Sequence, residues 1–175
     1  LYLRGIGNVE FTGSIQFSSA PLDVNMTSAS STVTLSGASA NTYTGGTTLY
    51  SGILVLNKAN ALSTSGNISL AASPGAATLR FTSNDTNDYS SRFSSNSGLT
   101  VDTNGLTITF GSALVGFANG ITVAGGGTLN LNGANSTYSG NTIVNSGTTV
   151  TLGNSDALGT HYLTNNGTVN VASGT

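Results

Sequence analysis

Short segments with alternating apolar and polar residues run along the whole chain. Their inward apolar sets are Val9/Phe11, Ile15/Phe17, Leu22/Val24, Val33/Leu35, Leu54/Leu56, Ile68/Leu70, Leu79/Phe81, Leu99/Val101, Leu106/Ile108/Phe110, Ile121/Val123, Leu129/Leu131, Val150/Leu152 and Val169/Val171. A period of two places these side chains on one face of a β-strand. We therefore expect short strands with two or three inward residues each, and we predict no helix, because apolar residues do not recur at helical spacing.

Pairs of turn-forming residues separate these segments. They are Ser51-Gly52, Gly45-Gly46, Asn104-Gly105, Asn119-Gly120 and Asn166-Gly167. Glycine and asparagine supply the positive φ angles of tight corners. We expect corners every 8 to 15 residues along the chain.

An internal repeat is the most informative feature of the sequence. The segment GASANTYTG at 37–45 returns as GANSTYSG at 133–140, so Tyr43 and Tyr138 are equivalent at an offset of 95 residues. The match continues through Ser51-Gly52 and Ser146-Gly147, Leu54/Leu56 and Val150/Leu152, and Ala61-Leu62 and Ala157-Leu158. The two copies span about 37–62 and 133–159.

Repeats that cannot bury an apolar face alone do so by stacking on their neighbours. The sequence therefore predicts an all-β fold, a right-handed parallel β-helix (β-solenoid) of short strands and Gly/Asn turns over residues 1–175. An antiparallel β-sandwich is the alternative, although it favours longer strands, more aromatic residues and little internal repetition.

Composition narrows the possible partners. Ser, Thr, Asn and Gly supply 96 of the 175 residues, and the formal net charge is only −2. So weak a field would not hold nucleic acid or an anionic membrane surface. No apolar run is long enough to span a bilayer, and with no cysteine, stability must come from packing and backbone hydrogen bonds.

The segment GANSTYSGNTIVNSGTTVTLGNSDALG at 133–159, together with 37–62, closely resembles the autotransporter-associated β-strand repeat of bacterial autotransporter passenger domains. The stretch between the copies, including Gly125 to Leu131, resembles the spacer between such repeats. The resemblance implies a right-handed parallel β-helix exported to the bacterial cell surface, in large proteins that serve adhesion, aggregation or projection. It implies no catalytic machinery and no cofactor.

Candidate chemistry is sparse. A Ser/His/Asp arrangement would need His161, the only histidine, beside Asp156 and an activated serine, so we expect no catalytic residue. The carboxylates are scattered: Glu10, Asp23, Asp85, Asp88, Asp102 and Asp156. A polysaccharide-cleaving enzyme would need such groups clustered in a groove, and this is the less favoured alternative.

Two segments invite a metal interpretation. Asp85 and Asp88 could gather around Ca²⁺ with asparagine carbonyls, but a solvated loop is the simpler expectation. Asp102-Thr103-Asn104-Gly105 resembles half a calcium loop without its later acidic ligands, so we expect an Asn-Gly corner. We assign no metal ligand.

Three further patterns have both a binding and a structural interpretation. Arg92 with Tyr89, in the polar stretch 82–97, could form a ligand-binding loop, or Tyr89 and Phe93 could be inward residues of a strand. The repeat tyrosines could stack on sugars, but we expect them to pack at corners. The pairs Thr32/Thr34, Thr107/Thr109 and Thr149/Thr151 resemble flat ice-binding solenoids, yet we expect no recurrence coil after coil, so that strand preference explains them.

The leading functional hypothesis is an extracellular structural or adhesive module that forms a stiff surface fibre. A carbohydrate-binding adhesin is the alternative. Because strand-like residues stand at Leu1 to Leu3 and at Val169 to Val171, we expect head-to-tail contact with identical or neighbouring units, within a longer protein or in a filament.

Overall fold

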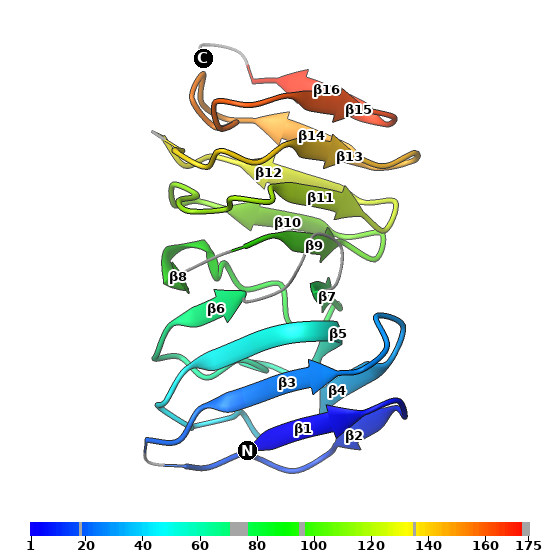
Figure 1. Ribbon diagram of the computed structural model, residues 1–175, viewed down its shortest axis with the longest axis vertical. Helices are drawn as coiled ribbons and strands as arrows, with labels where there is room; N and C mark the ends of the chain where they lie inside the picture. The colour runs from blue at the N-terminus through cyan, green and yellow to red at the C-terminus, as the bar shows by residue number, and fades with distance from the viewer. Residues whose placement is uncertain (18, 71–76, 95–96, 135, 173–175) are drawn as a thin grey trace.

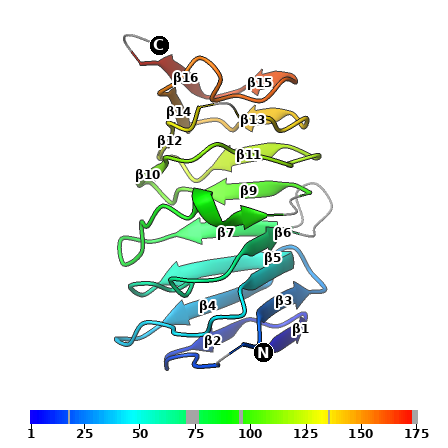
Figure 2. The same cartoon turned by 90° about the vertical axis from the view of Figure 1, so that its left-hand side faces the viewer.

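The fold is a stack of coils wound one above another (Figures 1 and 2). The structure is a computed structural model that describes residues 1–17, 19–70, 77–94, 97–134 and 136–172. The N-terminal strand lies at one end of the stack and the last strand at the other. One 3₁₀ turn, η1 (Ser90–Arg92), is the only helical element of the described residues, and none of their helices is long and apolar enough to cross a membrane.

Sixteen strands, most of them short, build the coils within the residues that the structure describes. They are β1 (Tyr2–Gly5), β2 (Val9–Phe11), β3 (Leu22–Met26), β4 (Thr32–Ser36), β5 (Thr47–Asn57), β6 (Ile68–Leu70), β7 (Ala77–Phe81), β8 (Phe93–Ser94), β9 (Leu99–Asp102), β10 (Thr107–Phe110), β11 (Ile121–Ala124), β12 (Thr128–Leu131), β13 (Thr142–Val144), β14 (Thr149–Leu152), β15 (Leu163–Asn165) and β16 (Thr168–Val171). Twelve of the thirteen predicted segments are strands, and Ile15/Phe17 is not, although Ile15 is buried.

Every pairing between these strands is parallel, and each strand pairs with the strand one coil away. Thr107 pairs with Thr128 and Thr128 with Thr149, so one coil takes 21 residues here. Asp23 pairs with Thr48, so an earlier coil takes 25. Such pairing needs a long connection back to the next strand, which a solenoid coil supplies and a hairpin does not. The parallel β-solenoid is confirmed, and the antiparallel sandwich is wrong.

The strands lie on three faces. Face 1 contains β1, β3, the first part of β5, β6 and β8. Face 2 contains β2, β4, the rest of β5, β7, β9, β11, β13 and β15. Face 3 contains β10, β12, β14 and β16. Face 2 runs the length of the stack, whereas face 1 ends at β8 and face 3 begins at β10.

The two repeat copies therefore lie on different faces. The first copy has its two strands in β5, which bends at Ser51-Gly52 from face 1 onto face 2. The second copy has them in β13 and β14, on faces 2 and 3. The offset of 95 residues is thus not a whole number of coils. The coil that contains β8, β9 and β10 visits all three faces and makes the change.

Aromatic rings gather at this changeover coil. Phe93 lies 5.4 Å from Phe110 and 5.7 Å from Phe117, both edge-on, and Phe117 lies 6.3 Å from Tyr138. Phe110 also lies 6.4 Å from Phe81. Edge-to-face pairs at such distances add to the stabilisation from burial alone. We infer that these large side chains fill the interior where the cross-section changes.

The predicted alternation holds along the stack. Leu22, Val24, Val33, Leu35 and most of the other predicted inward residues are buried, whereas the residues between them in β3 and β4 are partly exposed. The two that are exposed lie in the outermost coils: Val171 is 65% exposed and Val9 is 36% exposed. Inward residues gain their burial from a coil on each side, which these two coils lack among the described residues.

Four of the five predicted corners have a residue of positive φ: Gly46, Gly52, Gly120 and the pair Asn104-Gly105. The prediction is wrong for Asn166-Gly167, where neither residue has positive φ. At Gly120 (φ 79°), a Cβ would lie 1.9 Å from the carbonyl oxygen of Asn141 in the next coil. This corner therefore requires glycine for its φ and for the close approach of two coils.

Candidate functional site

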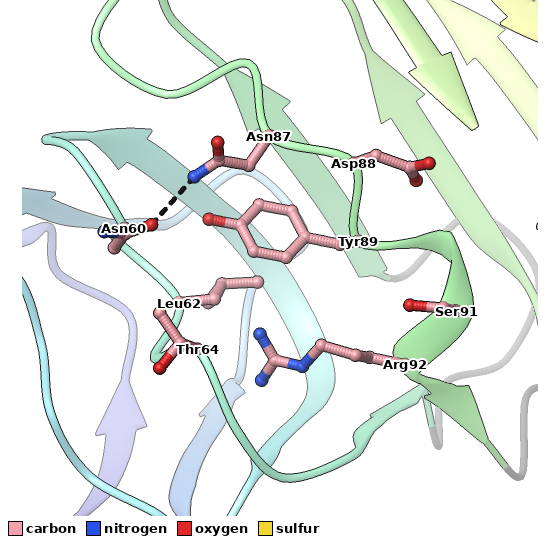
Figure 3. Close-up of a pocket in the computed structure, with 8 residues that line it drawn as sticks. All are labelled: Asn60, Leu62, Thr64, Asn87, Asp88, Tyr89, Ser91 and Arg92. Atoms are coloured by element: carbon pink, nitrogen blue, oxygen red, sulfur yellow. Dashed lines mark hydrogen bonds between the residues drawn. The ribbon is translucent and has the colours of Figure 1, made fainter. Parts of the chain in front are cut away.

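Two shallow grooves on the surface are the candidate sites. The first has a volume of about 320 Å³ and lies beside η1 (Figure 3). It is lined by Asn60, Leu62, Thr64, Asn87, Asp88, Tyr89, Ser91 and Arg92. These residues include the predicted ligand-binding pair, Tyr89 and Arg92, and one of the two aspartates of the candidate calcium loop.

Arg92 is committed to the neighbouring coil. Its Nε donates to the carbonyl oxygen of Gly66 and its Nη2 to that of Ser65, both at 2.8 Å, and its Nη1 donates to Ser63. Its guanidinium carbon lies 5.6 Å from the centre of the Tyr89 ring. Burial lowers the pKa of Arg92, and the nearby tyrosines oppose this shift. Arg92 therefore clamps one corner, and these donors are not available to a ligand.

Asp85 is buried, so the solvated-loop prediction is wrong for it. Its carboxylate accepts hydrogen bonds from the backbone N–H of Ala61 at 2.7 Å, the Tyr89 hydroxyl at 2.6 Å and the backbone N–H of Asn87 at 3.2 Å. Burial, followed by the bond and charge of Asp85, raises the pKa of Tyr89. A buried carboxylate needs such donors, and here they join two coils.

Asp88 joins the next pair of coils. It accepts from the N–H and the hydroxyl of Ser90, at 2.8 and 2.6 Å, and from the N–H of Gly111 at 2.7 Å. Both carboxylates of the candidate calcium loop are thus occupied by protein donors. Within the described ranges, no group of three acidic, histidine or cysteine side chains is arranged to hold a metal ion.

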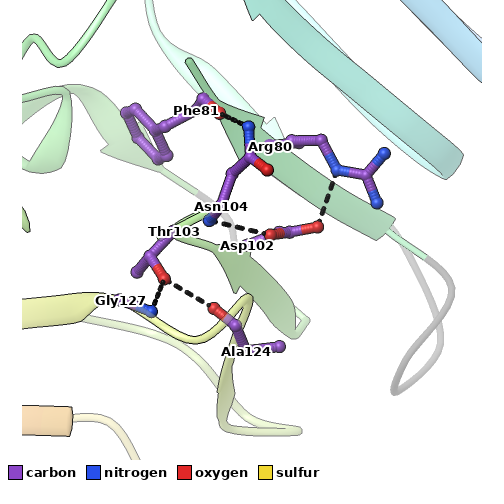
Figure 4. A network of polar contacts seen from close by, with 7 residues as sticks. All are labelled: Arg80, Phe81, Asp102, Thr103, Asn104, Ala124 and Gly127. Carbon is purple, nitrogen blue, oxygen red and sulfur yellow. Dashed lines mark hydrogen bonds and ion pairs between the residues drawn. The ribbon is translucent and has the colours of Figure 1, made fainter. Parts of the chain in front are cut away.

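The Asp102 to Gly105 segment is the predicted corner (Figure 4). The Asp102 carboxylate accepts from the N–H of Asn104 at 3.0 Å and from Nε of Arg80 at 2.7 Å. The buried Thr103 hydroxyl donates to the carbonyl of Ala124 and accepts from the N–H of Gly127, each at 2.9 Å. These bonds fix the corner against the coils on both sides, and the Asn-Gly prediction is confirmed.

The repeat tyrosines point inward and are buried. The hydroxyl of Tyr43 bonds to that of Thr47 at 2.6 Å, and Tyr138 bonds to Thr142 at 2.5 Å, four residues on in each copy. The predicted packing at corners is confirmed, and the alternative of sugar-stacking platforms is wrong. Desolvation raises the pKa of Tyr43.

The second groove, of about 430 Å³, is lined by Ala118, Asn119, Ser139, Gly140, Asn141, Ile143 and His161. His161 Nδ1 bonds to Oδ1 of Asn141 at 2.9 Å, and its ring stands edge-on to Tyr162. Asp156 instead accepts from Ser155 at 3.3 Å, so the hypothetical triad is not assembled. Sequence reasoning missed this groove because its residues come from three successive coils, and no local motif brings them together.

The passenger-associated-transport-repeat family matches residues 30–56 and 121–152. The first match contains β4 and almost all of β5, and the second contains β11 to β14. Both overlap the internal repeat copies, so the resemblance inferred from the sequence is confirmed. A search of curated proteins and a search of solved structures each found no match.

Proposed function

We propose that this chain, two segments of which match the passenger-associated-transport-repeat, is a section of a stiff rod displayed outside a bacterial cell. Such repeats imply a secreted or cell-surface protein. One observation carries the proposal: on face 2, eight strands from β2 to β15 pair in parallel from one end of the stack to the other. A continuous ladder resists bending, because each coil is bonded to both neighbours.

The side chains around the first groove support this mechanical role. Asp85, Asp88 and Arg92 each bond to at least one backbone group of an adjacent coil. An enzyme of the polysaccharide-cleaving class would instead present free acids or bases to a substrate. The geometry therefore favours a structural repeat over a catalytic one.

Negative-stain electron microscopy of the protein from its native source tests the proposal. We expect rods one solenoid wide that lengthen by about 4.8 Å per coil. Protease treatment of intact cells, followed by immunoblotting, tests the location separately, and we expect loss of the protein without lysis. Round particles, or protection from the protease until lysis, would contradict the rod or its display respectively.

Adhesion to glycans is a second candidate, and the second groove favours it. Asn119 and Ser139 line this groove and are exposed, and His161 joins it to a neighbouring pocket that the exposed ring of Tyr162 lines. Amides, hydroxyls and an aromatic face are the groups that bind neutral sugars. Glycan-array binding that is lost in Asn119→Ala and kept in Arg92→Ala would support it, whereas no binding by the unaltered chain would refute it.

End-to-end contact is the third element of the proposal. Tyr2 and Ile6 are exposed at one end of the stack, and Tyr162, Leu163 and Val171 at the other. Apolar groups beside open strand edges favour pairing with another coil, from the same protein or from a neighbouring copy. Concentration-dependent sedimentation of the isolated chain is expected, and a single monomeric species at all concentrations would rule out contact between separate copies.

A further inference from the structure

The outer side of face 3 carries a regular array of small polar side chains. Register places Thr107, Thr128, Thr149 and Thr168 in one column. Thr109, Asn130, Thr151 and Asn170 form a second column beside it. All eight are exposed or half-buried. As expected, the threonine pairs themselves do not recur coil after coil, because Asn130 and Asn170 take the second position in alternate coils. The first column, however, is threonine in all four coils, which the sequence does not show directly.

The array has two fixed spacings. Adjacent parallel strands lie about 4.8 Å apart, and alternate residues along a strand lie about 6.6 Å apart. The three pairings of this face run in register throughout. Threonine is stiff at χ1 in a strand, and the amide of Asn130 donates to the hydroxyl of Thr109 at 3.3 Å. Binding through such held groups loses little conformational entropy.

Face 2 has no comparable array. Its outer column Thr78, Thr100, Thr122 is followed in register by Ile143. Its second column includes Arg80, which is paired with Asp102 at 2.7 Å. A long charged side chain and an apolar one thus interrupt the pattern. The two columns on face 3 contain neither a charged nor an aromatic side chain.

We propose that face 3 binds a surface of ordered water, that is, ice. The partner must be neutral, because nothing in the two columns attracts an ion. It must offer donors and acceptors in a two-dimensional repeat, because the array offers both at regular spacing. A sugar surface would favour an aromatic platform, which is missing here. Ice meets these requirements, and the threonine methyl groups add apolar contact between the hydroxyls. This inference is independent of surface display.

Slow freezing of a dilute solution of the chain tests the inference. We expect the unaltered chain to be enriched in the growing ice. The enrichment should be lost in Thr128→Lys and in Thr149→Lys, because a long lysine side chain would prevent face 3 from contacting the ice surface. Thr122→Lys on face 2 is the matched control and should remain enriched. Circular dichroism of all three variants checks that the fold is retained.

Exclusion of the unaltered chain from ice would overturn the proposal, as would equal losses in Thr122→Lys and Thr149→Lys. A dimer in sedimentation velocity that Thr149→Lys dissociates would overturn it too, since a second copy would then occupy the face. Retention on an insoluble polysaccharide that requires the same threonines would likewise assign the face to a different partner.

Discussion

Replacing Gly120 by alanine tests how closely the coils approach each other. The left-handed conformation of Gly120 costs an alanine about 1 to 2 kcal/mol. The new Cβ would also lie 1.9 Å from the carbonyl oxygen of Asn141 and 2.6 Å from its nitrogen. These are backbone atoms of the next coil and cannot rotate away. That oxygen accepts the N–H of Ile121 at 2.9 Å, a bond worth about 1 kcal/mol.

We therefore expect Gly120→Ala to lower the free energy of unfolding by at least about 3 kcal/mol, once the separation of two coils is included. Gly116→Ala is the matched control, because Gly116 has the same φ of 79° in the same loop but no atom within 4 Å of a Cβ. The free energy of unfolding of Gly116→Ala should fall only by the conformational cost of the left-handed alanine, about 1 to 2 kcal/mol. Guanidinium denaturation followed by circular dichroism measures both variants, with unchanged m-values required for the comparison. Equal losses would refute the close-approach explanation.

Three further predictions follow from the core and the charged groups. Phe110→Ala should cost about 3 to 5 kcal/mol in the same denaturation assay, because the ring is buried among other rings, and half-buried Phe11→Ala should cost clearly less. The fold raises the pKa of Tyr89 above the unfolded value of about 10, so the stability contributed by its protonated hydroxyl is complete below pH 10 and declines as pH rises further. The free energy of unfolding should therefore fall less steeply above pH 10 in Tyr89→Phe than in the unaltered chain, and an unchanged slope would contradict this. Trypsin should cut the folded chain slowly at Lys58 and Arg92. Lys58 is buried, and its amine donates a hydrogen bond to the carbonyl oxygen of Gly13. Early cleavage at either residue, detected by mass spectrometry, would contradict this prediction.

The resemblance to a passenger repeat and the strand alternation led to the correct fold, but the candidate sites were less predictable. The sequence indicated that Asp85, Asp88 and Arg92 lie in a polar stretch, and a polar stretch suggests solvent. Each of them also bonds to a backbone group some 23 to 29 residues away. Such contacts depend on which residues of adjacent coils lie side by side, and that depends on the length of every intervening corner.

The sequence by itself determined which side chains point inward, where most corners fall and that two segments are copies, because period-two alternation and positive-φ residues are local properties. Only the tertiary structure decided which face each strand joins. The copies share their inward tyrosines but occupy different faces, because the coil with β8, β9 and β10 includes one extra strand. The tertiary structure also brought the two outer columns of face 3 into register. Alternation specifies which side chains of a strand point inward, but not which residues of the next coil pair with that strand.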